Sequence, residues 1–124
     1  LSPDLLARLL LREARGGAGD VPEADIKGYA APYHEPAAKH AFLATARSIV
    51  SEKGDDIAAS YRAIEQPALL VWCRRDPIVP LRTGKKLART LPNARLAVLE
   101  GCHHLPQDER PEKLLEVLKP FLRP

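Results

Sequence analysis

Several features are missing or scarce in this chain of 124 residues. It contains no methionine, not even at position 1, so we expect it to be a piece of a longer protein. Its two cysteines are too few for a disulfide framework, which favours buried free thiols and a reducing, cytoplasmic location. The first residues lack the layout of a secretory signal. No apolar run approaches the roughly 18 residues that a membrane span requires.

The chain also has no segment in which charges of one sign cluster. The formal net charge is +3, and the basic residues are scattered along the sequence. A nucleic-acid-binding surface needs basic side chains gathered on one face, so we read these residues as solvated surface. We therefore expect neither nucleic acid nor a membrane as a partner.

The pattern of the sequence changes near Gln66. Before it, apolar residues recur at helical spacing and are separated by glycine and proline. Ser2 and Pro3 suit the start of a first helix, which Gly16 and Gly17 should end. Asp20 and Glu23 have capping-box spacing ahead of a second helix. Residues 31–36 read as a loop, and a longer helix should follow, with Phe42, Leu43, Ala46, Ile49 and Val50 on its apolar face.

One more helix is expected at the end of this half, beginning at Asp55 and Asp56. From residue 67 onward the pattern predicts strand, helix, strand and helix. The predicted ranges are 68–72 and 96–99 for the strands, and 81–91 and 111–122 for the helices. The first strand is continuously apolar, as expected of a strand covered on both faces in a parallel sheet. The sequence therefore predicts an α/β fold with a helical region at 1–64 and a β-α-β-α region at 65–124.

Asp76 and His104 follow the two predicted strands. Parallel strands joined by a helix have their carboxyl ends at the same edge of the sheet, so residues 28 positions apart should meet there. An acid and a histidine so placed are two members of a nucleophile–His–acid triad. The third is missing, because no Gly-x-Ser-x-Gly sequence occurs in the chain.

Simpler interpretations exist for the same residues. Asp76 precedes a proline, so one alternative is that it serves simply to start a turn. The alternative for His104 is a structural hydrogen bond within its loop. His103 is the rival histidine. Cys73 and Cys102, together with the two histidines, also form a zinc-type ligand set, although the cysteines are isolated and the adjacent histidines should point apart. A disulfide between the cysteines is a further alternative to free thiols.

Two stretches of the second half resemble the α/β-hydrolase family. Residues 67–72 with Asp76-Pro77-Ile78-Val79-Pro80 are similar to the strand and loop that carry the family's acid. Gly101-Cys102-His103-His104-Leu105-Pro106, followed by Glu109, Pro111 and Glu112, resembles the loop that carries its histidine. The chain departs from the family at Cys73 and His103, which stand where glycine is usual.

The resemblance implies a C-terminal portion of such a hydrolase, preceded by a helical cap. Asp76 and His104 would be the catalytic acid and base for hydrolysis of an ester, epoxide or carbon–halogen bond in a small-molecule substrate. Neither a cofactor nor a metal is implied. The missing N-terminal half of the core, in the same polypeptide or a partner chain, would supply the nucleophile, whose identity stays open. The segment alone should be inactive. The alternative is a truncated, non-catalytic chain that acts as a binding or interaction module.

Overall fold

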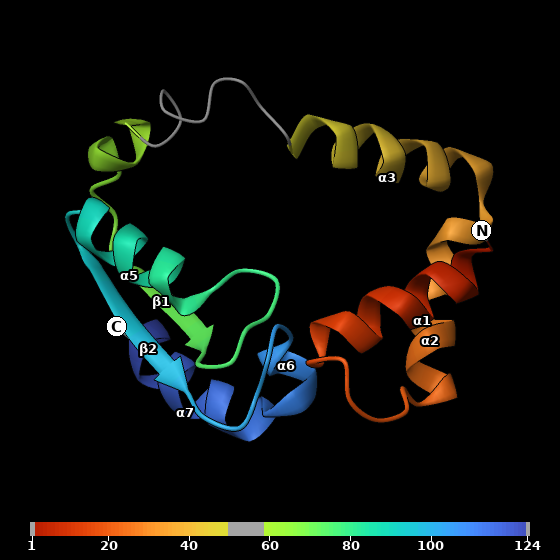
Figure 1. Cartoon of the computed structure of the whole chain (residues 1–124). Coiled ribbons are helices and arrows are strands. Elements are labelled where there is room, and N and C mark those ends of the chain that lie inside the picture. Colours follow the sequence, from red (N-terminus) through yellow and green to blue (C-terminus); the bar gives the residue numbers. More distant parts are fainter. Residues whose placement is uncertain (1, 50–58, 124) are drawn as a thin grey trace. The chain divides into compact units, whose positions relative to one another are not determined.

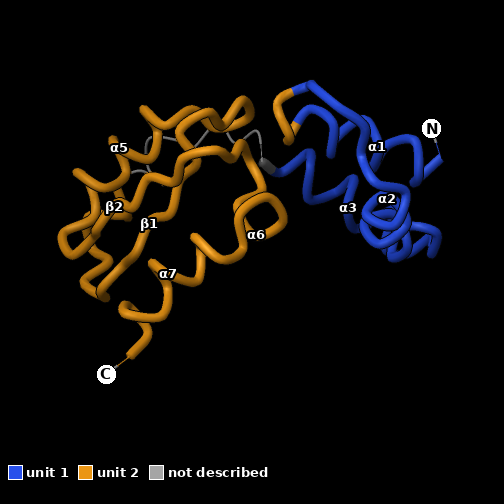
Figure 2. Tube along the Cα trace, turned by 90° about the horizontal axis from the view of Figure 1, so that it is seen from below, with its two compact units in different colours: residues 1–13, 17–54 blue, residues 14–16, 55–124 orange. Residues whose placement is uncertain are grey.

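The computed structural model describes residues 2–49 and 59–123 (Figure 1). The chain divides into two compact units, shown in Figure 2. The first unit comprises Leu1–Glu13 and Gly17–Gly54, and the second comprises Ala14–Gly16 and Asp55–Pro124. We describe each unit by itself. The boundary between residues 64 and 65 that the sequence suggests stays a prediction.

The first unit is helical. It contains α1 (Pro3–Ala14), α2 (Glu23–Ala30), the 3-10 helix η1 (Ala31–His34) and α3 (Pro36–Ile49). The start of α1 is as predicted, because the backbone N–H of Leu5 donates to Ser2 Oγ at 3.3 Å. Its end is also as predicted. Gly16 and Gly17 have φ of 84° and 76°, a conformation that favours glycine.

Two other local expectations for this half were wrong, at the start of α2 and at residues 31–36. Asp20 does not cap α2, because the residue before the helix is Pro22 and no side chain caps it. The expected loop at 31–36 contains η1, a tight turn that Pro32 tolerates near its start. The expected apolar face of α3 is only partly covered, since Leu43 is 43% exposed. The residues at which a further helix was expected to begin, 55 and 56, lie outside the described residues.

The core of the first unit is small and centred on α2. Ile26 and Ala30 are fully buried. Two side-chain contacts join the elements around this core. Arg8 forms an ion pair with Glu23 at 2.7 Å, and His34 Nε2 lies 3.1 Å from Asp4 Oδ2. Both pairs are solvent-exposed, so each contributes little to stability, while the buried apolar side chains contribute most of it.

The second unit contains the predicted sheet. Strands β1 (Ala68–Cys73) and β2 (Ala94–Leu99) pair in parallel, so that Cys73 lies opposite Leu99 at their carboxyl ends. Helix α5 (Leu81–Thr90) connects them, and α6 (Pro106–Glu109) and α7 (Pro111–Leu122) follow β2. The predicted α/β fold class is confirmed, with strands one or two residues longer than expected. The short helix α6 was not predicted.

Helices α5 and α7 pack on opposite sides of these strands, as Figure 1 shows. Successive side chains of a strand point to opposite faces. The Trp72 ring lies against Gly84 of α5, whereas Cys73 belongs to a buried cluster that contacts Leu114 and Val117 of α7. This packing fixes β1 and β2, and with them the two loops that leave their carboxyl ends.

No helix in ranges 2–49 and 59–123 combines the length and the hydrophobicity needed to cross a membrane.

Candidate active site

Asp76 and His104 meet at the carboxyl edge of the two strands. Asp76 lies in the acid loop, residues 74–80, which follows β1. His104 lies in the histidine loop, residues 100–105, which follows β2. His104 Nδ1 is 2.9 Å from Asp76 Oδ2 and 3.0 Å from Asp76 Oδ1. The Asp76 side chain is 7% exposed and the His104 side chain 33% exposed. The acid is therefore enclosed while the imidazole keeps one side open.

The same carboxylate also organises its own loop. Asp76 Oδ1 accepts the backbone N–H groups of Ile78 at 2.8 Å and Val79 at 2.9 Å. This is the turn that an aspartate before proline favours. The turn interpretation and the acid interpretation of Asp76 are thus compatible, because one side chain makes both sets of contacts.

Trp72 braces the acid loop from the strand. Its indole Nε1 donates to the carbonyl of Val79 at 2.8 Å. The ring is held against α5 because Gly84 has no side chain. A Cβ atom at that position would lie 2.7 Å from the ring. The acid loop is therefore held by Trp72 at one point and by the Asp76 carboxylate at another.

The neighbouring histidine has a different partner. His103 Nδ1 lies 2.8 Å from Glu109 Oε2 at the end of α6. The two histidines therefore point to different carboxylates, as expected for adjacent residues, and His104 is the one that reaches Asp76. Glu109 was noticed in the sequence only as part of the family resemblance. Its contact could not be derived because α6 was not expected.

The backbone of the histidine loop is bonded at three consecutive residues. Glu109 Oε1 accepts the N–H groups of His103 at 3.0 Å and Leu105 at 3.3 Å. The carbonyl of Ala14 accepts the N–H of His104 at 2.9 Å. Ala14 belongs to the short segment Ala14–Gly16 that packs in the second unit. A Cβ on Gly16 would lie 2.7 Å from the His103 ring, so this segment fits closely against the loop.

Cys73 and Cys102 form a disulfide with their Cα atoms 5.3 Å apart. The expectation of free thiols was wrong. Parallel pairing puts the end of β1 beside the residues after β2, which brings the two sulfur atoms together. The bond joins the last residue of β1 to the histidine loop. It also removes both cysteines from the zinc-type ligand set considered above.

Within residues 2–49 and 59–123, the hydrogen-bond partner of the His104 ring is Asp76. That contact uses Nδ1, which leaves Nε2 for a reacting group. Two serines of the described ranges are bonded elsewhere: Ser2 Oγ accepts a backbone N–H at the start of α1, and Ser48 Oγ donates to the carbonyl of Thr45. A histidine that a carboxylate orients in this way can act as a general base towards a nucleophile placed at Nε2.

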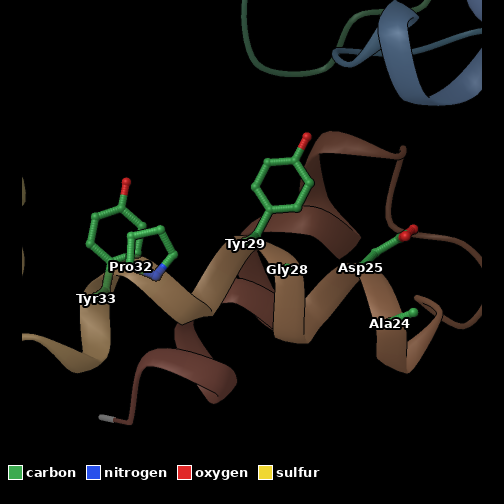
Figure 3. Close-up of a pocket in the computed structure, with 6 residues that line it drawn as sticks. All are labelled: Ala24, Asp25, Gly28, Tyr29, Pro32 and Tyr33. Carbon is green, nitrogen blue, oxygen red and sulfur yellow. The ribbon is translucent and has the colours of Figure 1, made fainter.

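The first unit has a shallow pocket of its own, shown in Figure 3. It is lined by Ala24, Asp25, Gly28, Tyr29, Pro32 and Tyr33. The Tyr29 and Tyr33 side chains rise from the same side of the ribbon in Figure 3. Both tyrosines are largely exposed, and the lining contains one carboxylate and no histidine. The pocket therefore lacks the acid–base pair found at the strand ends.

Known proteins resemble this chain in sequence and in fold. A sequence model of the alpha/beta hydrolase family matches residues 2–117. The uncharacterized hydrolase YugF of Bacillus subtilis is 35% identical over 103 residues, which is 83% of this chain and 37% of that protein. A 2-hydroxy-6-oxononadienedioate/2-hydroxy-6-oxononatrienedioate hydrolase of Burkholderia vietnamiensis is 40% identical over 60 residues, which is 48% of this chain and 21% of the relative.

Solved structures resemble the fold over most of the chain. A serine hydrolase involved in carbazole degradation, the CarC enzyme, superimposes with a TM-score of 0.82 at 21% identity, over 96% of this chain and 46% of that one. An alpha/beta hydrolase fold protein from Burkholderia ambifaria gives a TM-score of 0.69 at 28% identity, over 93% and 42% respectively. The chain thus spans less than half the length of these relatives.

Proposed function

The chain belongs to the alpha/beta hydrolase family, and we propose that it carries the acid and the base of a hydrolytic site, Asp76 and His104. The nucleophile comes from a companion segment, by which we mean the stretch of polypeptide outside this sequence that completes the sheet. That segment belongs to the same polypeptide or to a partner chain.

The chemistry follows from the two nitrogens of the His104 ring. The Asp76 carboxylate accepts a hydrogen bond from Nδ1–H, which fixes the tautomer that has a basic Nε2. If the nucleophile is serine or cysteine, Nε2 takes its proton as it attacks the substrate and returns that proton to the leaving group. If the nucleophile is aspartate, Nε2 takes a proton from the water that attacks the ester intermediate. In both routes Asp76 stabilises the imidazolium that forms.

The observation that carries this proposal is the 2.9 Å contact between His104 Nδ1 and Asp76 Oδ2. Two features support its use in catalysis. Asp76 is enclosed, which strengthens its interaction with the ring, and the His104 side chain is 33% exposed, so the ring is not closed off from a substrate.

The substrate is proposed to be a small molecule, and the helical region at 1–64 is proposed to act as a cap. Ester, epoxide and carbon–halogen bonds are the candidates that the triad chemistry covers. Several relatives are named 2-hydroxy-6-oxononadienedioate/2-hydroxy-6-oxononatrienedioate hydrolases, such as that of Paraburkholderia phymatum. Such a compound has none of these three bonds, so its hydrolysis breaks a carbon–carbon bond beside the 6-oxo group. These compounds therefore enter the substrate panel as a fourth bond type. No cofactor is part of the proposal.

The proposal is tested by mutation in the complete polypeptide or assembly that contains the companion segment. His104→Ala should lower kcat by at least about 1,000-fold. Asp76→Asn should also lower kcat strongly, because it removes the charge that selects the His104 tautomer. Its Oδ1 atom can still accept the N–H groups of the turn, so the loop should keep its shape. His40→Ala, an exposed histidine on α3, is the matched control and should keep full activity.

Hydrolysis that survives His104→Ala would exclude this function. If no substrate in the panel is turned over and no nucleophile is found in the assembly, the chain is the non-catalytic binding module considered from the sequence. The proposed companion segment is then a structural partner only.

A cytoplasmic location is also proposed from the sequence. The argument from two free thiols no longer supports it, because the cysteines are paired in the structure. Cell fractionation followed by detection of the protein tests the location. Recovery in the cytosolic fraction supports it, and recovery outside that fraction contradicts it.

A further inference from the structure

The carboxylate of Glu109 holds the histidine loop on both sides of His104. Its Oε1 atom accepts the N–H of His103 at 3.0 Å and the N–H of Leu105 at 3.3 Å. Its Oε2 atom lies 2.8 Å from the ring of His103. We propose that Glu109 is a positioning residue, which fixes the backbone at His104 so that its ring meets Asp76. This inference rests on the proposed function.

The three N–H groups of residues 103, 104 and 105 all point at acceptors. Ala14 provides the acceptor for His104, and Glu109 provides both others. A carboxylate makes stronger hydrogen bonds to backbone N–H groups than a carbonyl does. The Glu109 side chain is only 14% exposed, so water competes weakly for it. Glu109 is therefore the main restraint on this loop beyond the disulfide.

The restraint matters because catalysis by His104 depends on its placement. The loop carries no secondary structure at residues 101–105, so its backbone bonds go to Glu109 and Ala14 and not to a neighbouring strand. A shift of about 1 Å in a catalytic group costs on the order of 100-fold in rate. Loss of Glu109 leaves Cys102 and Ala14 to hold the loop, and the ring of His104 gains freedom to leave Asp76.

Glu109 makes two kinds of contact: the backbone clamp, which is its pair of bonds to the N–H groups of His103 and Leu105, and its contact with the His103 ring. Two substitutions of Glu109 distinguish which of them matters. Glu109→Gln keeps an amide oxygen that accepts the two N–H groups but removes the charge. Glu109→Ala removes every contact. A clamp predicts that the glutamine variant rescues function, while an essential His103–Glu109 ion pair predicts that it does not.

The experiment uses the complete assembly that supplies the nucleophile, with Glu116→Gln as the control, an exposed glutamate on α7. Glu109→Ala should lower kcat about 30-fold with KM changed less than about twofold, because binding groups stay in place. Glu109→Gln should recover activity to within about fivefold of the wild type.

A spectroscopic measurement reports the same geometry without turnover. The proton on His104 Nδ1, hydrogen-bonded to Asp76, should give a downfield proton NMR signal that disappears in His104→Ala. The signal should weaken or exchange faster in Glu109→Ala and persist in Glu109→Gln and Glu116→Gln. If Glu109→Ala fails to fold, Glu109→Asp takes its place. The shorter side chain withdraws its oxygens from both N–H groups, and kcat should fall about tenfold.

An unchanged kcat and an unchanged NMR signal in Glu109→Ala or Glu109→Asp would overturn the inference. A glutamine variant as impaired as the alanine variant would overturn it too, in favour of the ion pair. The proposed function fails separately, if His104→Ala keeps its activity. In that case the NMR response to position 109 still decides whether Glu109 positions His104.

Discussion

Asp76 illustrates how one side chain serves a turn and a site together. Its Oδ1 atom accepts two backbone N–H groups of the acid loop, and both of its oxygens lie near His104 Nδ1. The turn bonds hold the carboxylate in place. In the proposed reaction the carboxylate would therefore need little reorganisation when the imidazolium forms, which is how preorganised groups stabilise a transition state.

Gly84 gives a prediction at the residue scale. Replacing a glycine inside a helix by alanine usually stabilises the protein, and at Gly84 we expect the opposite. Glycine inside a helix costs about 1 kcal/mol relative to alanine. Here a Cβ would lie 2.7 Å from the Trp72 ring, which is itself bonded to the acid loop. We expect Gly84→Ala to lower the free energy of unfolding by about 1–3 kcal/mol, because the ring and helix must separate. Urea denaturation of the complete protein measures it.

Gly28 in α2 is the matched control for this change. A Cβ at Gly28 would meet no atom within 4 Å, so Gly28→Ala should stabilise the protein by about 0.5–1 kcal/mol. Replacing Trp72 by leucine should remove most of the Gly84→Ala penalty. Equal, stabilising effects at the two glycines would show that Trp72 does not pack against α5 as described.

At the scale of elements, the ends of the two strands are joined covalently. The disulfide of Cys73 and Cys102 closes a loop with a sequence separation of 29 residues. Closing a loop of this length removes conformational freedom from the unfolded chain and is worth about 3 kcal/mol. We expect Cys73→Ala/Cys102→Ala to lower the free energy of unfolding by this amount. Equilibrium denaturation of the complete protein under oxidising conditions measures the change.

The control is the response to reductant. Dithiothreitol should shift the denaturation midpoint of the wild type towards that of the double variant and leave the double variant unchanged. The unfolded, oxidised wild type should react with no thiol reagent. Two reactive thiols in that sample would contradict the disulfide.

The regular elements of the second unit were the predictable part of the fold. Continuous apolar residues in β1, and a proline at the start of α7, are local signals, and the structure follows them. The meeting of Asp76 and His104 was predictable as well, since it needs only parallel strands. Helix α6 was not, because four residues give too short a pattern to detect. The contacts of Glu109 and the disulfide follow from where loops pack, and two isolated cysteines carry no local signal.

At the scale of the whole molecule, the described sheet of the second unit has fewer strands than a stable parallel sheet usually has. The described sheet has two strands, so each strand has one unpaired edge. Parallel sheets are usually covered on both faces and paired along their edges. Apolar side chains are also left in water, since Leu115 is 47% exposed and Ile78 is 46% exposed. These surfaces are what a companion segment would cover.

We therefore expect the isolated chain to aggregate or to unfold without a sharp transition, and to show no His104-dependent hydrolysis. Co-expression with the companion segment should give a stable complex that hydrolyses its substrate, because the segment adds strands and the nucleophile together. Light scattering after size-exclusion chromatography and steady-state kinetics measure the two effects. Co-expression with His104→Ala should restore folding but not activity, which separates the structural contribution from the chemical one. An isolated chain that is monomeric, unfolds cooperatively and turns over substrate through His104 would show that the two strands suffice and that the nucleophile lies within these 124 residues.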